Sequence, residues 1–248
     1  STSEFASLSD QELKQVIRVT VEQASGRVPV MAGTAANSTK ATIERTQYAQ
    51  SVGADAALIV PPFYGLPSQQ ELFEHYKSVS QNVDIQIMLY NNPWFSGVDM
   101  RPETIAGLAE FPTIQYVKES SADMRRVHEI QHLGGENIEV WCGWDDLALE
   151  CFLMGCPGWV CPTSNFLPAF CAELFERAEE KNYESAREMY FRLLPFLQYL
   201  ESGQLVAKAK EALNLIGKTG GVPRRPFLPL TAEQKAELKT MLQSIGAI

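Results

Sequence analysis

The sequence lacks a surplus of basic residues, since its 248 residues include 21 Lys and Arg against 30 Asp and Glu, a formal net charge of −9. A protein that binds nucleic acid or an anionic membrane surface needs positive surface charge, so we expect neither partner. The sequence also lacks an apolar run of the ~18 residues that a transmembrane helix requires, so no membrane span is predicted.

Cysteine is scarce, and no two of the five cysteines are spaced as Cys-x-x-Cys. The odd count and the apolar residues around them predict reduced, buried thiols, and therefore a cytoplasmic protein. A Gly-x-Gly-x-x-Gly fingerprint follows none of the predicted strands, which weakens the case for an open sheet that binds a dinucleotide.

Segments with strand-like and helix-like patterns alternate along most of the chain. The first helix is predicted to begin at Ser9-Asp10-Gln11-Glu12, which is a capping box. The predicted strands are apolar on both faces, as in a parallel sheet covered by helices. They comprise residues 28–34, 56–61, 85–90, 114–118, 138–142 and 159–161. These make about six β/α units at intervals of roughly 20–30 residues, which indicates βαβ repeats. Because a (β/α)8 barrel needs eight strands, the sheet is either open and doubly wound, or two further strands precede Ser1.

The alternation ends near Asn182. Three helical segments follow, at residues 183–200, 204–216 and 231–244. We therefore predict a β/α part at residues 1–181 and a small helical appendage at residues 182–248.

Two predicted strands end in residues that can carry chemistry, Tyr90 and Lys118. In parallel α/β proteins, active sites form where the strands end at their carboxyl termini. A lysine among apolar neighbours can lose its proton and attack a carbonyl group, and a nearby phenol can move the protons. The pair therefore outlines a Schiff-base lyase. The alternatives are an ordinary surface lysine and a core tyrosine with a satisfied hydroxyl.

The segment His128-Glu129-Ile130-Gln131-His132 matches the zinc-protease pattern His-Glu-x-x-His. Two histidines four residues apart share one helix face and can bind zinc. The segment follows the strand of Lys118, however, and should form a helix on the outside of a barrel. We therefore expect a chance match and no metal site, with a zinc hydrolase as a remote alternative.

Several short segments, spread in order over essentially the whole chain, carry a resemblance to a known family. They are Ser1-Thr2-Ser3-Glu4, Val30-Met31-Ala32-Gly33-Thr34, Asn37-Ser38-Thr39, Pro61-Pro62-Phe63-Tyr64, Leu89-Tyr90-Asn91-Asn92-Pro93, Val117-Lys118-Glu119-Ser120, Cys142-Gly143-Trp144-Asp145 and Trp159-Val160-Cys161-Pro162-Thr163-Ser164-Asn165. Together they resemble the dihydrodipicolinate synthase and N-acetylneuraminate lyase family of class I Schiff-base enzymes. No single segment is decisive, but the ordered set is strong.

The resemblance implies a (β/α)8 TIM barrel, here residues 1–181, with a C-terminal helical extension, residues 182–248. It also implies that this sequence begins at the end of the second strand. The first strand, first helix and most of the second strand would then be missing, which would explain why six strands are predicted. Members of the family are commonly tetramers built from tight dimers, so a homotetramer is expected.

The resemblance also assigns catalytic roles to four residues. Lys118 matches the lysine that condenses with the keto group of pyruvate or a related 2-oxo acid. Tyr90 matches the tyrosine that moves protons at the imine carbon and the substrate oxygen. Ser1 takes the place of a hydroxyl that links this tyrosine to a second one, matched by Tyr64, which in the family crosses a dimer interface.

Substrate-binding roles follow from the same resemblance. Thr2 matches a residue that helps to hold the carboxylate of the 2-oxo acid, and the Val160 carbonyl matches one that faces the site. Gly143 and Phe95 also fall at substrate-binding positions. No cofactor is implied, and the partners are a small 2-oxo acid and an aldehyde.

Two positions depart from the family pattern. Phe95 stands where dihydrodipicolinate synthases place an Arg that binds the carboxylate of aspartate semialdehyde, and Ser3 replaces a Gly. The expected function is therefore a Schiff-base lyase or synthase of dihydrodipicolinate synthase type, with the aldehyde open. The alternatives are a 2-keto-3-deoxy sugar-acid aldolase or dehydratase, a hydratase-aldolase, and a catalytically retired barrel that acts as a binding protein.

Overall fold

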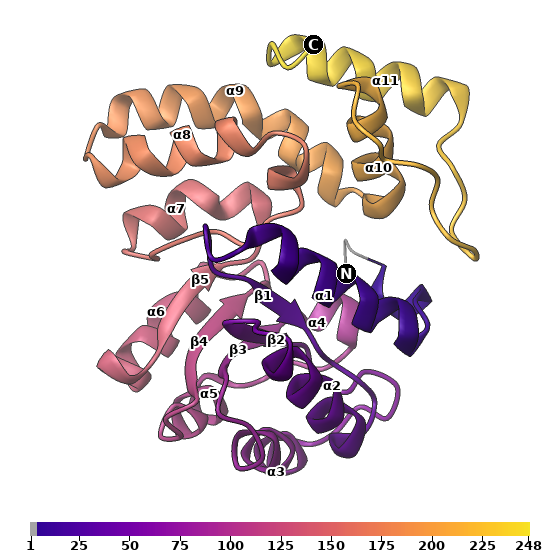
Figure 1. Cartoon of the computed structure of the whole chain (residues 1–248). Helices are drawn as coiled ribbons and strands as arrows, with labels where there is room; N and C mark the ends of the chain where they lie inside the picture. Colours follow the sequence, from indigo (N-terminus) through magenta and orange to yellow (C-terminus); the bar gives the residue numbers. More distant parts are fainter. Residues whose placement is uncertain (1–3) are drawn as a thin grey trace. The chain divides into compact units, whose positions relative to one another are not determined.

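A computed structural model describes residues 4–248 of the chain (Figure 1). These residues form two compact units, which we treat separately. The sheet unit is Leu8–Trp141, and the helical unit is Cys142–Ile248 together with residues 4–7. This division by packing does not test the expected domain boundary between residues 181 and 182, which stays a prediction.

A single sheet with the strand order β1-β2-β3-β4-β5 forms the centre of the sheet unit. The pairs β1–β2, β2–β3 and β3–β4 are parallel, which confirms the predicted α/β class. The strands are β1 (Met31–Gly33), β2 (Ala56–Ile59), β3 (Gln86–Asn91), β4 (Ile114–Glu119) and β5 (Glu139–Cys142).

The predicted sixth strand at residues 159–161 is wrong. Trp159 forms only an isolated parallel bridge to Cys142. Pro162 follows directly, and because proline has no N–H to donate, it cannot continue a ladder. The first strand is also shorter than predicted, since Met31–Gly33 replaces residues 28–34. The described residues thus contain five strands.

The helices of the sheet unit begin at caps that the sequence encodes locally. Ser9 and Glu12 form the predicted capping box, because the Glu12 N–H donates to Ser9 Oγ and the Ser9 N–H donates to the Glu12 carboxylate. Ser68 and Glu71 repeat this arrangement. The helices are α1 (Asp10–Ala24), α2 (Thr39–Ser51), α3 (Gln69–Ser80), α4 (Pro93–Ser96), α5 (Pro102–Leu108) and α6 (Met124–Gly134).

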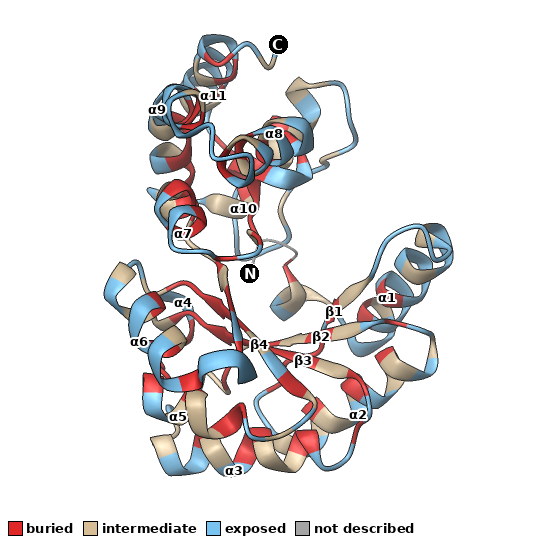
Figure 2. Cartoon of the chain, turned by 90° about the vertical axis from the view of Figure 1, so that its left-hand side faces the viewer, coloured by how far each residue is buried: buried red, intermediate tan, exposed pale blue. Residues whose placement is uncertain are grey.

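The core of the sheet unit lies between the sheet and the inward sides of these helices (Figure 2). Leu72 and Tyr76 of α3 are fully buried, and the Tyr76 hydroxyl donates to the Ile59 carbonyl at 3.0 Å. Each fully buried Leu or Ile stabilises the fold by roughly 1.5–3 kcal/mol. This packing fixes the strands whose ends carry the candidate residues.

The helical unit consists mainly of helices, as predicted for the end of the chain. It contains α7 (Ala148–Leu153), α8 (Pro168–Glu179), α9 (Tyr183–Glu201), α10 (Leu205–Leu215) and α11 (Ala232–Ser244). Helices α8 and α9 pack against each other. The ion pair between Lys210 and Glu4, at 2.9 Å, attaches residues 4–7 to this unit.

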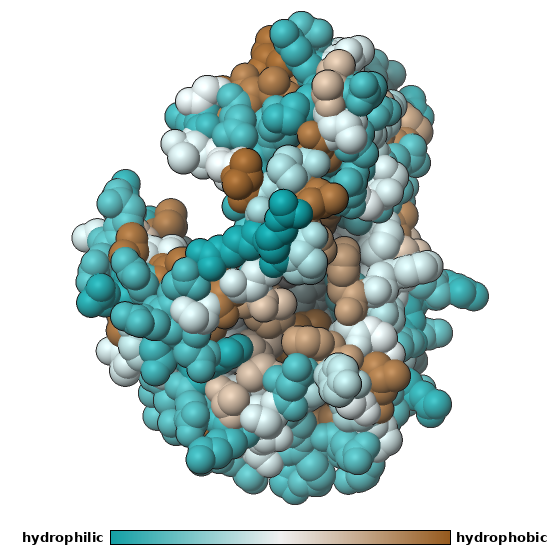
Figure 3. Space-filling view, turned by 90° about the vertical axis from the view of Figure 1, so that its right-hand side faces the viewer, coloured by the Kyte–Doolittle hydropathy of each residue, from teal (hydrophilic) through white to brown (hydrophobic). Residues whose placement is uncertain are grey.

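Three findings concern the surface, the cysteines and the lengths of the helices. On the face in Figure 3, apolar residues form small groups among polar ones. All five cysteines are buried and none belongs to a disulfide bond, which confirms the prediction of reduced, buried thiols. Among residues 4–248, no helix combines the length and the hydropathy needed to cross a membrane.

Candidate active site

Lys118 and Tyr90 face each other on neighbouring parallel strands. Lys118 of β4 lies opposite Tyr90 of β3 in the register, near the carboxyl end of both strands. Its Nζ lies 4.2 Å from the centre of the Tyr90 ring, and each residue is 7% exposed. Within the described residues no carboxylate pairs with Lys118 Nζ, so the amine is available to a carbonyl carbon. An ordinary surface lysine would be exposed, so the burial of Lys118 argues against that alternative.

The Tyr90 hydroxyl accepts a hydrogen bond from a side chain to which the sequence pattern assigned no role. Asn92 Nδ2 donates to the Tyr90 oxygen at 2.8 Å. Asn92 also caps α4, since its Oδ1 accepts from the Phe95 N–H at 3.1 Å. An Asn before a Pro is a sequence signal for such a cap, but the contact with Tyr90 has no local signal.

A second polar cluster lies on the other face of the same strand ends. Because neighbouring residues of a strand face opposite sides, Asn91 and Glu119 point away from Tyr90 and Lys118. Asn91 Nδ2 donates to Glu119 Oε2 at 3.0 Å and to Asp99 Oδ1 at 3.1 Å. Arg126 of α6 then pairs with Asp99 at 2.7 Å. The cluster therefore ties β3 to β4 behind the candidate site.

Burial in this cluster has an electrostatic consequence. Desolvation raises the pKa of Glu119, and hydrogen bonds from Ser121 and Asn91 act in the opposite direction. The Ser121 N–H donates to Glu119 Oε1 at 2.6 Å. These donors offset part of the cost of burying the carboxylate.

The other candidate residues of the sheet unit are exposed. Tyr64 is 89% exposed and Phe95 is 60% exposed. Trp94, beside Phe95 in α4, is also exposed, and its indole N–H donates to the Ser121 carbonyl at 3.1 Å. The α4 turn therefore presents an aromatic surface where the family resemblance places an Arg.

The remaining candidates do not belong to the sheet unit. Gly143 and Val160 are half-buried residues of the helical unit, where the Val160 N–H donates to the Cys142 carbonyl at 2.9 Å. Ser1 and Thr2 lie outside the described residues. The roles of these four residues stay predictions.

The zinc pattern falls on an exposed surface. His128 and His132 lie on α6, and both are exposed. Across residues 4–248, no three His, Cys, Asp or Glu side chains gather closely enough to hold a metal ion.

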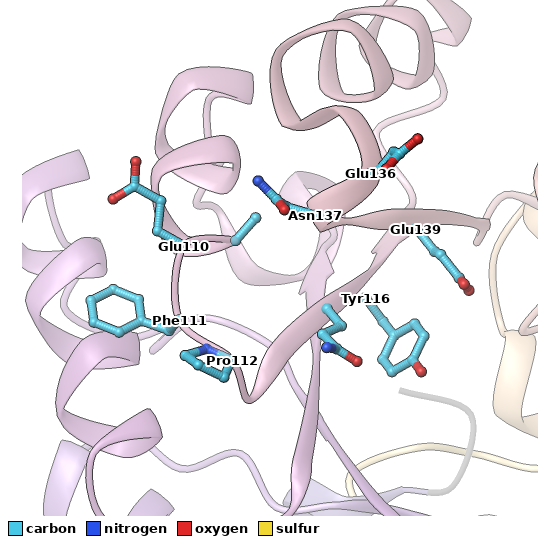
Figure 4. A pocket seen from close by; sticks show the side chains of 9 residues that line it. Glu110, Phe111, Pro112, Tyr116, Glu136, Asn137 and Glu139 are labelled. Atoms are coloured by element: carbon cyan, nitrogen blue, oxygen red, sulfur yellow. The ribbon is translucent and has the colours of Figure 1, made fainter.

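A cavity of about 360 Å³ lies toward the opposite end of β4 (Figure 4). Its lining includes Gln115 and Tyr116 from the start of β4, and the carboxylates of Glu110, Glu136 and Glu139. Three carboxylates would repel an anionic substrate. Because its lining includes the start of β4 and neither Tyr90 nor Lys118, the cavity is distinct from the site at Lys118.

Comparisons with known proteins show which family the chain resembles along its whole length. The model of the dihydrodipicolinate synthetase family matches residues 1–245. The chain is 37% identical to the 4-hydroxy-tetrahydrodipicolinate synthase of Geotalea uraniireducens, over 100% of this chain and 86% of that protein.

Solved structures of family members have the same fold as this chain. The dihydrodipicolinate synthase of Acinetobacter baumannii, complexed with pyruvate, superposes with a TM-score of 0.96 at 33% identity, over 100% of this chain and 85% of that one. YagE, a prophage protein of E. coli K12 also complexed with pyruvate, gives 0.94 at 29% identity over the same shares.

Proposed function

Because the chain belongs to the dihydrodipicolinate synthetase family, it is a class I Schiff-base lyase or synthase of dihydrodipicolinate synthase type, and we propose that Lys118 supplies the amine. The observation that carries the assignment is the position of Lys118 Nζ, 4.2 Å from the centre of the Tyr90 ring. The substrate that we propose is pyruvate or a related 2-oxo acid.

The proposed chemistry begins with attack of the Lys118 amine on the keto carbon. The keto oxygen leaves as water, and a protonated C=N bond forms. This imine withdraws electrons, so a proton is lost from C3 and an enamine forms. The enamine carbon then bonds to the aldehyde carbon, and the aldehyde oxygen takes up a proton. Tyr90 is the group that we propose for the proton transfers.

Residues beyond this pair complete the proposal. Ser1 and Tyr64 would form a proton path with Tyr90, and Thr2, Gly143 and the Val160 carbonyl would bind the 2-oxo acid. The 89% exposure of Tyr64 supports a position in a subunit interface, because an aromatic ring is rarely left in water.

The aldehyde is where this chain departs from the synthases. Phe95 cannot form the bidentate, charge-assisted pair that an Arg makes with a carboxylate. Two arginines of α6, the helix after the strand of Lys118, already have carboxylate partners: Arg125 pairs with Asp123 at 2.6 Å and Arg126 with Asp99 at 2.7 Å. We therefore propose an aldehyde that is either less polar than aspartate semialdehyde or derived from a sugar.

The finer architecture is also a proposal. The likeness to solved family members supports an eight-stranded TIM barrel with a C-terminal helical extension. We propose a homotetramer. We also propose a cytoplasmic location, because none of the five cysteines belongs to a disulfide bond. Sedimentation equilibrium of the purified protein tests the tetramer.

Exchange of the pyruvate methyl protons with deuterium tests the proposed function without knowledge of the aldehyde. Only the imine and enamine steps are needed, and proton NMR follows the loss of the methyl signal. The protein and a Lys77→Arg control, whose lysine is a partly exposed residue of α3, should both catalyse the exchange. Lys118→Arg should leave only the uncatalysed rate, and exchange by that variant would reject Lys118 as the nucleophile.

A further inference from the structure

Asn92 occupies an unusual place in the candidate site, because one side chain joins the Tyr90 hydroxyl to the backbone of α4. The residue is 3% exposed and comes two positions after Tyr90. Its Nδ2 lies 2.8 Å from the Tyr90 oxygen, and its Oδ1 lies 3.1 Å from the Phe95 nitrogen.

The orientation of this amide follows from its partners. The Phe95 N–H can only donate a hydrogen bond, so the atom facing it must be the Asn92 oxygen. The NH2 group therefore faces Tyr90, and it can only donate. The Tyr90 oxygen is consequently an acceptor in this contact, and its own O–H is left to donate in another direction.

The turn that carries Asn92 is held by further hydrogen bonds. The Asn92 carbonyl accepts from the Ser96 N–H at 3.0 Å and from Ser96 Oγ at 2.8 Å. Ser96 Oγ also accepts from the Val98 N–H at 3.2 Å. Because these contacts fix the turn, the Asn92 amide is held in place before any substrate binds.

A fixed donor at a phenol oxygen has a chemical effect. When Tyr90 gives up its proton, negative charge develops on its oxygen, and a preorganised N–H group stabilises that charge. When the oxygen takes a proton back, the same contact keeps the hydroxyl in one direction.

We propose that Asn92 is a positioning residue for proton transfer, which directs the Tyr90 hydroxyl and stabilises the charge that develops on its oxygen. The proposal rests on the proposed function, in which Tyr90 carries out the proton transfers at C3 of the imine and at the aldehyde oxygen. It adds a residue to that mechanism and links the proton-transfer group to the turn that bears Phe95.

Two variants separate the donor from the helix cap. Asn92→Asp keeps an oxygen for the Phe95 N–H but replaces the donor with an acceptor. Asn92→Ser also keeps a capping oxygen, adds no charge, and is too short to reach Tyr90. In both variants we expect kcat for pyruvate methyl exchange to fall by roughly 10-fold or more, as for loss of one preorganised donor. The KM for pyruvate should change by less than about 3-fold, because the contact acts on the proton-transfer step.

Ser96→Ala is the matched control for the turn. It removes a hydroxyl that holds the same turn but does not touch Tyr90. Because the Ser96 N–H still donates to the Asn92 carbonyl in this variant, we expect its kcat to stay within about 3-fold of the unmodified protein. A loss in Ser96→Ala equal to that in Asn92→Ser would show that Asn92 acts only through the stability of the turn, and would overturn the proposal.

A double-mutant cycle with Tyr90→Phe gives the decisive readout. If Asn92 acts through the Tyr90 oxygen, Asn92→Ser should have little further effect once that oxygen is gone. The same fold-loss in both backgrounds would overturn the proposal. These outcomes differ from failure of the proposed function, in which the unmodified protein itself exchanges no pyruvate protons and the Asn92 proposal falls with it.

Discussion

Replacement of Glu119 by Ala should destabilise the protein, because this carboxylate joins the ends of the two strands that carry Tyr90 and Lys118. Glu119 is 4% exposed and accepts hydrogen bonds from Asn91 Nδ2 at 3.0 Å and from the Ser121 N–H at 2.6 Å. The Ala variant leaves both donors without this acceptor.

The size of the stability loss depends on which acceptors or solvent remain available to each donor. A buried donor without an acceptor costs about 1–3 kcal/mol. Asn91 Nδ2 still reaches Asp99 Oδ1 at 3.1 Å, and Ser121 is only half-buried, so both losses fall at the lower end. Removal of a carboxylate whose burial raises its pKa recovers part of the cost. We expect a net loss of about 1–2 kcal/mol, or a Tm lower by about 2–8 °C for a chain of this size.

Thermal unfolding followed by circular dichroism measures this effect. Glu129→Ala is the control, because Glu129 is an exposed residue of α6 and its loss should change stability by less than about 0.5 kcal/mol. Glu119→Gln, which keeps one acceptor oxygen, should fall between the two. A Tm for Glu119→Ala equal to that of the control would refute the reasoning that this cluster ties β3 to β4.

Three further predictions concern catalysis, specificity and acid stability. Tyr90→Phe should lower turnover on the order of 10²-fold with little change in Tm, and turnover within a few-fold of the unmodified enzyme would remove Tyr90 from the mechanism. Phe95→Arg should raise kcat/KM for aspartate semialdehyde by on the order of 10²-fold, whereas Trp94→Arg should not; efficient use of this aldehyde by the unmodified enzyme would contradict the proposal. Burial lowers the pKa of His75 to about 4 from 6.5, so the folded protein binds fewer protons than the unfolded chain in this interval. The free energy of unfolding should be highest above pH 6.5, the ordinary pKa of His, and should fall by roughly 3 kcal/mol as the pH drops toward about 4, the pKa of His75 in the folded protein. Urea unfolding should show a shallower pH dependence of this free energy for His75→Asn. Equal slopes for the two proteins would contradict the prediction.

The parts of the fold that the sequence predicted depend on local chemistry. The Ser9–Glu12 capping box needs only two side chains three residues apart, and the structure contains it. The sequence also predicted that Tyr90 and Lys118 lie close together, because each residue ends an apolar segment and the two segments form neighbouring parallel strands. The family resemblance, which the comparisons confirm, rests on the same short segments.

The parts that the sequence did not predict depend on contacts between segments. Residues 159–161 have a strand-like composition, but Pro162 leaves them with a single bridge to Cys142. The hydrogen bond between Asn91 and Glu119 depends on the register of β3 and β4, which neither segment encodes alone. Asn92 reaches Tyr90 only because its backbone turns at φ −142° and ψ 80° before α4.

Trapping of the imine tests the central claim most directly. The protein is incubated with pyruvate and sodium borohydride, and the reduced adduct is located by mass spectrometry of its peptides. A single adduct at Lys118 is the expected result. The absence of an adduct would contradict the account, as would an adduct at another lysine, such as Lys208, the other buried lysine among the described residues.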